Sequence, residues 1–139
     1  MTQEAIMLVE DNPDDAELML RALRKNQIQN EVQVFKNGKD ALAKLKSENS
    51  TLPGLVVLDL NLPGISGHEV LKQIRGFERT QLLPVIIMTT SADKRDLLTS
   101  YKNGANSYVR KPVDSVLFDE AVRQISQYWL GLNEPPPIH

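Results

Sequence analysis

The chain has 139 residues, with 16 lysines and arginines against 18 aspartates and glutamates, for a net charge of −2. This length fits one domain, and a composition of 41% hydrophobic and 24% charged residues is typical of a folded protein. The charge balance argues against nucleic acid as a partner, because that binding needs a basic excess. Cysteine is absent and only two histidines are present, which excludes disulfides and argues against histidine-based catalysis. No apolar run approaches the roughly 20 residues needed to cross a bilayer, so we expect a cytoplasmic protein without a membrane partner.

The chain begins with a strand pattern followed by a helix pattern. Residues 5–9 are continuously apolar, which predicts a buried strand. Asn12 is a typical helix cap, and Pro13 suits the first helical position. Apolar residues then recur at helical spacing as far as Leu23, so we predict a helix that closes at Lys25.

This alternation continues to the end of the chain. Further strands are predicted at residues 32–35, 55–58, 85–88 and, more weakly, 107–109, and further helices at residues 38–46, 68–75 and 93–102 and from about residue 114. The order predicts an α/β fold, a doubly wound five-stranded parallel sheet with five helices and the flavodoxin-like strand order 2-1-3-4-5. Residues 32–35 alternate in polarity, which suits an edge strand. We expect one domain over residues 1–132 with no output module, and a proline-rich, disordered tail over residues 133–139.

Polar side chains follow four of the five predicted strands. Ligands of such sheets bind at the carboxyl ends of the strands. The residues at these ends are Glu10 and Asp11 after the first strand, Asp59 after the third, Thr89 after the fourth and Lys111 after the fifth. In the expected order the first and third strands are neighbours, so the three acids should converge in one pocket.

An acidic pocket of this kind needs positive charge. Two carboxylates about 4 Å apart repel by roughly 4 kcal/mol at an effective dielectric near 20. Oxygen ligands without cysteine favour Mg²⁺, and Lys111 supplies a second positive charge. A carboxylate beside both cations is a competent nucleophile toward phosphorus, and Asp59, which leads into a turn, is the candidate. The main-chain carbonyl of Asn61 is a further candidate metal ligand.

Five motifs together resemble the receiver domains of bacterial response regulators. They are residues 9–12, 58–67, 84–89, 103–105 and 111–112, which occur in the family's order and spacing over roughly residues 4–130. The resemblance implies a phosphoacceptor switch that catalyses its own phosphorylation from a partner histidine kinase, rather than a turnover enzyme.

The resemblance also implies residue roles. Asp59 would be phosphorylated, Asp11 would bind Mg²⁺ directly with the Asn61 carbonyl, and Glu10 would act through a metal-bound water. Thr89 would turn toward the phosphoryl group, and Lys111 would pair with it and precede a cis bond to Pro112. Tyr108 stands where receivers often carry an aromatic that swings inward on activation; a static, half-buried tyrosine is the alternative. His68 is interpreted as a solvated residue near a helix start.

Within the family, the chain is most similar to small regulators that partner bacterial phytochrome kinases. The residues that carry this narrower resemblance are 59–63, 89–91 and 127–130. Thr90 departs from the usual alanine or glycine and adds bulk near the phosphoryl position.

The last helix has an apolar arc of about 140°, wider than the roughly 100° stripe that one core contact needs. Phe118, Val122 and Trp129 lie along one edge of this arc, and we interpret them as an exposed partner surface. The alternative is that the broad stripe sinks deeper into the core. The expected partner is a second copy of the chain, in a homodimer through the fourth and fifth helices.

Two functions of other classes remain open. A flavodoxin-like FMN carrier shares the fold, but it would hold the flavin phosphate where this chain has Glu10, Asp11, Asp14 and Asp15. A receiver-like binding module that never accepts phosphate is the second alternative. A haloacid-type phosphatase would need a second carboxylate two residues after its nucleophile, where this chain has Asn61.

Overall fold

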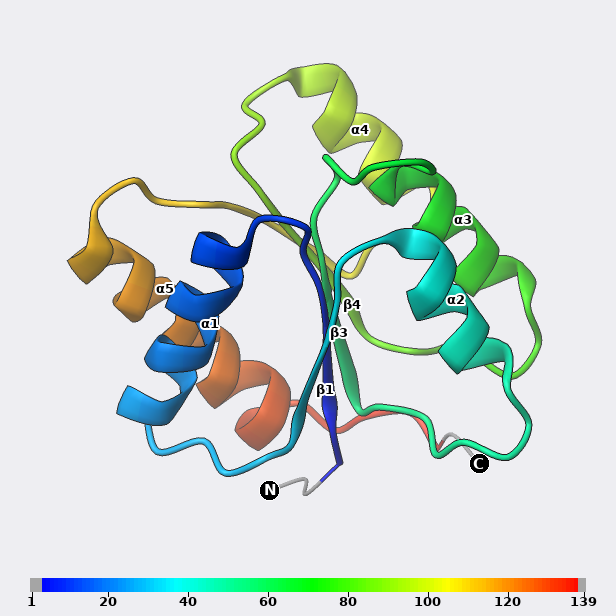
Figure 1. The fold of residues 1–139 in the computed structure, drawn as a ribbon, viewed down its shortest axis with the longest axis horizontal. Helices are drawn as coiled ribbons and strands as arrows, with labels where there is room; N and C mark the ends of the chain where they lie inside the picture. Colours follow the sequence, from blue (N-terminus) through cyan, green and yellow to red (C-terminus); the bar gives the residue numbers. More distant parts are fainter. Residues whose placement is uncertain (1–3, 138–139) are drawn as a thin grey trace.

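A parallel five-stranded sheet forms the centre of the molecule in the computed structural model, which describes residues 4–137 (Figure 1). The strand order is β2-β1-β3-β4-β5. The strands are β1 (Ile6–Val9), β2 (Val32–Phe35), β3 (Leu55–Leu58), β4 (Val85–Thr89) and β5 (Ser107–Arg110). The predicted topology is confirmed, including the edge position of β2.

Five helices cover the two faces of the sheet. They are α1 (Pro13–Lys25), α2 (Gly38–Lys46), α3 (Gly67–Gly76), α4 (Lys94–Lys102) and α5 (Ser115–Ser126). Helices α1 and α5 lie together on one face, while α2, α3 and α4 lie side by side on the other (Figure 1). Each predicted helix is present within one residue of its expected bounds.

Side-chain caps fix where the helices begin. Asn12, Asn37, Ser66, Asp93 and Asp114 each accept backbone N–H groups of the following first turn. Such a cap stabilises a helix by about 1 kcal/mol, because it satisfies donors that have no partner within the helix. All five caps lie in loops that leave the carboxyl ends of the strands, so they also hold the loops at that edge of the sheet.

The core consists of two apolar layers separated by the sheet. Met7 and Val9 of β1 point into the layer beneath α2 and α3, whereas Ile6 and Leu8 point into the layer beneath α1 and α5. Strands β1, β3 and β4 are buried at every position. Their continuous apolar runs follow from this two-sided covering.

The prediction that Phe118, Val122 and Trp129 form an exposed partner surface on the last helix is wrong. Phe118 is 4% exposed, Val122 is 1% exposed, and Trp129 is partly buried against the same core layer. A π-helical segment, Gln127–Leu132, continues α5. The edge of the arc that carries Phe118 and Val122 packs into the core, whereas Leu117, Tyr128 and Leu132 on the opposite edge are exposed.

Residues 134–137 form neither helix nor strand. The predicted disorder of residues 133–139 stays a prediction, and its last two residues lie outside the described part of the chain. Over residues 4–137, the helices are too short or too polar for any of them to span a membrane.

Candidate functional site

The ends of β1 and β3 bring the three predicted acids together. Val9 pairs with Leu58 in the parallel register, and the Asp59 N–H donates to the Val9 carbonyl at 3.1 Å. Glu10 and Asp59 therefore leave neighbouring strands at the same level. Carboxylate oxygens of Glu10, Asp11 and Asp59 lie within 4.8 Å of one another, which confirms the predicted convergence.

The acids differ in their exposure to solvent. Glu10 and Asp59 are buried, while Asp11 is exposed. Burial raises the pKa of the Glu10 carboxyl, although hydrogen bonds from Lys111 and from the Asn12 N–H act in the opposite direction. The Asn61 N–H donates to Asp59 Oδ1 at 3.2 Å, so the main chain of Asn61 lies beside the central carboxylate.

Lys111 reaches this cluster from the end of β5, as predicted. Its Nζ contacts a carboxylate oxygen of Glu10 and lies 3.0 Å from Asp59 Oδ2. Burial alone would lower the pKa of Lys111, but hydrogen bonds to Glu10 and Asp59 raise it above its usual value. The ammonium therefore stays charged and offsets part of the repulsion among the acids.

Asp15 is a fourth acid at the site, and it was not predicted to contact Lys111. Its Oδ2 lies 3.0 Å from Lys111 Nζ. The available signal was its place in the first turn of a helix that begins directly after the acidic pair of Glu10 and Asp11.

Thr89 and Tyr108 both contact Ser91, a residue that the sequence interpretation did not assign to the site. Thr89 is fully buried at the end of β4, and its Oγ1 accepts a long hydrogen bond of 3.4 Å from the Ser91 N–H. The half-buried Tyr108 packs against the core and donates its hydroxyl to the Ser91 carbonyl at 3.1 Å. The ring is therefore in an inward position; its movement on activation stays a prediction.

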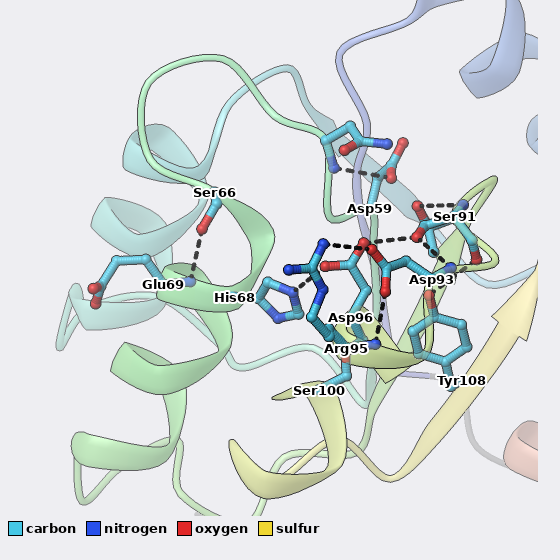
Figure 2. Close-up of polar contacts among 12 residues, drawn as sticks. Asp59, Ser66, His68, Glu69, Ser91, Asp93, Arg95, Asp96, Ser100 and Tyr108 are labelled. Carbon is cyan, nitrogen blue, oxygen red and sulfur yellow. Dashed lines mark hydrogen bonds and ion pairs between the residues drawn. The ribbon is translucent and has the colours of Figure 1, made fainter. Parts of the chain in front are cut away.

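Two expectations about single residues are wrong. His68 lies near the start of α3 as expected, but it is not freely solvated: its side chain is only 22% exposed and its Nε2 lies 3.2 Å from Asp96 Oδ1, where the start of α3 packs against α4 (Figure 2). The Lys111–Pro112 bond is trans, since residues 4–137 contain no cis peptide. The trans form is the lower-energy isomer for most X–Pro bonds.

The donor set fits a hard divalent cation. Carboxylates supply oxygen ligands, and nitrogen and sulfur ligands are absent from the three-residue cluster. The three clustered acids and Asp15 also outnumber the single ammonium, that of Lys111, which contacts Glu10, Asp15 and Asp59. A bound cation would therefore relieve the remaining repulsion.

Sequence comparisons agree with this chemistry. A family model described as the response regulator receiver domain matches residues 6–123. The probable methanogenesis regulatory protein FilR2 of Methanothrix harundinacea is 40% identical over 134 residues, covering 94% of this chain and 86% of that protein. The response regulator Rcp1 of Synechocystis is 34% identical over 131 residues, covering 91% and 89% of the two chains.

Solved structures show the same fold. The phosphorylated cyanobacterial phytochrome response regulator RcpA is 33% identical and superposes with a TM-score of 0.92, covering 98% of this chain and all of that one. The Mn²⁺-bound form of Rcp1, also 33% identical, gives a TM-score of 0.88 with coverage of 96% and 99%.

Proposed function

Because the chain belongs to the response regulator receiver domain family, we propose that Asp59 accepts a phosphoryl group from a partner histidine kinase in the presence of Mg²⁺. One observation carries the assignment of this residue. Asp59 lies at the centre of the site, with one carboxylate oxygen 3.0 Å from Lys111 Nζ and the other bonded to the Asn61 N–H.

Receiver domains bind a divalent metal in an acidic pocket, and the Mn²⁺-bound Rcp1 structure is an example from a similar chain. In this chain Asp11, Asp59 and the main-chain carbonyl of Asn61 would hold Mg²⁺ directly, and Glu10 would act through a water. When bound, the cation neutralises negative charge on the transferring phosphoryl group. The exposure of Asp11 leaves the cluster open to an ion from solvent.

Asp59, Lys111 and Thr89 each have a separate role in the transfer step. A carboxylate oxygen of Asp59 attacks phosphorus, the P–N bond of the kinase phosphohistidine breaks, and its electron pair stays on the imidazole nitrogen. Lys111 then moves its hydrogen bond from Asp59 to a phosphoryl oxygen, and the Thr89 hydroxyl approaches the same group. The transfer therefore needs no general base from the chain, since an ionised carboxylate is already a nucleophile.

The partner is proposed from the relatives. RcpA is described as a phytochrome response regulator, so a bacterial phytochrome kinase is the proposed phosphoryl donor, in the cytoplasm. A homodimer through the α4 to α5 face is supported by exposed apolar side chains, in place of the buried Phe118 and Val122 and the partly buried Trp129. These side chains are Leu97, Leu98 and Tyr101 on α4 and Val116 and Leu117 on α5.

The proposal is tested by incubating the protein with acetyl phosphate and Mg²⁺ and measuring its intact mass. We expect one phosphoryl adduct, which Asp59→Asn abolishes and which the matched control Asp119→Asn, on α5 away from the cluster, retains. Equal labelling of Asp59→Asn would contradict the assignment. A flavin absorbance in the purified protein would favour the FMN carrier instead.

A further inference from the structure

A chain of hydrogen bonds joins the start of α3 to the loop between β4 and α4, outside the acidic cluster (Figure 2). His68 Nε2 on α3 lies 3.2 Å from Asp96 Oδ1 on α4. The Ser91 hydroxyl in the loop donates to the other oxygen, Asp96 Oδ2, at 2.6 Å. Asp96 therefore connects two segments that are more than 20 residues apart in sequence.

Ser91 connects this series of hydrogen bonds to two residues of the proposed phosphorylation site, Thr89 and Tyr108. Its N–H donates to Thr89 Oγ1, and its carbonyl accepts the Tyr108 hydroxyl. Its own hydroxyl accepts the Asp93 N–H at 3.2 Å while donating to Asp96. Every polar group of Ser91 is thus engaged, and Asp96 bonds the hydroxyl of the same residue whose carbonyl accepts the Tyr108 hydroxyl.

The charge of Asp96 determines which groups donate the hydrogen bonds between Ser91, Asp96 and His68. Hydrogen bonds from Ser91 and then from His68 lower the pKa of Asp96, so its carboxylate is ionised and acts only as an acceptor. The Ser91 hydroxyl and His68 Nε2 must therefore both donate to it. Bonds to a charged acceptor are stronger than neutral ones, which makes Asp96 the strongest link of the chain.

The second ring nitrogen of His68, the buried Nδ1, has no hydrogen-bond partner among the described residues. An unsatisfied buried nitrogen carries a free-energy cost, which disappears if α4 moves and water reaches the ring.

We propose that Asp96, anchored by His68, is a positioning residue: it holds the Ser91 carbonyl where Tyr108 binds it and so favours the inward Tyr108 conformation. Where Asp59 is the phosphoacceptor, a larger inward population raises the rate of phosphorylation, because the apparent affinity for the phosphoryl donor scales with the competent fraction. This second step rests on the proposed function; the effect on Tyr108 does not.

The test begins with Tyr108 in the protein without a phosphoryl donor. Fluorotyrosine labelling gives three NMR signals, one for each tyrosine, and Tyr108→Phe identifies the signal of interest. We expect Asp96→Ala and His68→Ala to shift this signal toward that of a solvent-exposed ring. His68→Gln, which retains a donor, should restore much of the wild-type position. The control Lys94→Ala, on the exposed side of the first turn of α4, should leave it unchanged.

The second measurement is the initial rate of Asp59 labelling by acetyl phosphate in Mg²⁺. Loss of the Asp96 bonds should lower this rate roughly two- to tenfold, the range that one or two hydrogen bonds represent. In a Tyr108→Phe background, which lacks the hydroxyl, the effect of Asp96→Ala should fall below about twofold, because the two residues act through the same bond.

These outcomes separate positioning from simple packing. A merely structural Asp96 would lower the rate by the same factor in both backgrounds, and that result would overturn the inference. An unchanged Tyr108 signal in Asp96→Ala would also overturn it. Absence of labelling in the wild-type protein would instead refute the proposed function, while the NMR measurement would still decide the role of Asp96.

Discussion

Gly67→Ala tests whether the backbone around Asp59 depends on a glycine at the start of α3. A Cβ at position 67 would lie 2.3 Å from the Asp59 carbonyl oxygen and 2.6 Å from Leu60 Cα. Ordinary contacts of this kind begin at 3.4 Å, so the two segments must separate by about 1 Å. Both atoms belong to the backbone of Asp59 and Leu60, and the separation therefore moves Asp59 itself.

The expected loss is large for a single added methyl group. Overpacking of this kind costs about 1–3 kcal/mol. For a chain of this length that cost lowers the Tm by roughly 4–12 °C. A displacement of about 1 Å at a reacting group lowers its rate on the order of 100-fold.

The assay pairs thermal unfolding with the rate of acetyl phosphate labelling. Gly76→Ala is the matched control, because a Cβ at the other end of α3 meets no atom within 4 Å. Its stability should be unchanged or higher by about 0.4–1 kcal/mol, from the smaller entropy of the unfolded chain. If Gly67→Ala unfolds and reacts like the wild type, the close approach of α3 to Asp59 has no role.

Three further predictions concern the charges of the site. In the metal-free protein, burial raises the pKa of the Glu10 carboxyl above its ordinary value of 4.5, so the folded state favours the protonated form. The stability that this protonated carboxyl contributes is present below pH 4.5 and is lost as the pH rises through the raised pKa. Glu10→Gln should therefore raise the Tm at pH 7 and lose this advantage below pH 4.5; a gain independent of pH would contradict the assigned cause. Mg²⁺ at 100 times its Kd should stabilise the protein by about 2.7 kcal/mol in calorimetry, and Asp11→Asn should remove most of this shift. An equal shift in that variant would place the ion elsewhere. Lys111→Met leaves the carboxylates of Glu10, Asp15 and Asp59 without their ammonium and should lower the free energy of unfolding by about 3–5 kcal/mol in urea titrations without metal. A loss below about 1 kcal/mol would show that water already screens the cluster.

The sheet and the residues at its edge were predictable from the sequence. Strands β2 and β3 begin and end at the residues predicted for them, because polar or turn-forming residues bound the alternating pattern of β2 and the apolar run of β3. In a parallel sheet the register brings the residue after each strand to the same edge. The convergence of Glu10, Asp59 and Lys111 can therefore be predicted without knowing how the helices pack.

Side chains carried by helices were not predictable in the same way. The contact between Lys111 and Asp15 spans 96 positions, and that between His68 and Asp96 spans 28. Each depends on the angle and offset of a helix against its neighbour, which hydrophobic periodicity alone leaves undetermined. The last helix shows the same limit, since its apolar periodicity did not reveal that Phe118 and Val122 would be buried while Leu117 is exposed.

Substitutions at the ends of the strands and substitutions on the helices should affect the site in different ways. The groups proposed to perform the chemistry leave the ends of strands, which are fixed by the backbone ladder of the sheet. The groups proposed to adjust it, Asp96 and His68, lie on helices that pack through side chains and can shift by small amounts. Substitution of Asp96 should therefore change how fast Asp59 is phosphorylated while the site stays intact, whereas substitution of Asp59 should abolish the chemistry. Variants of α3 and α4 that retain metal binding but differ in labelling rate would establish that separation.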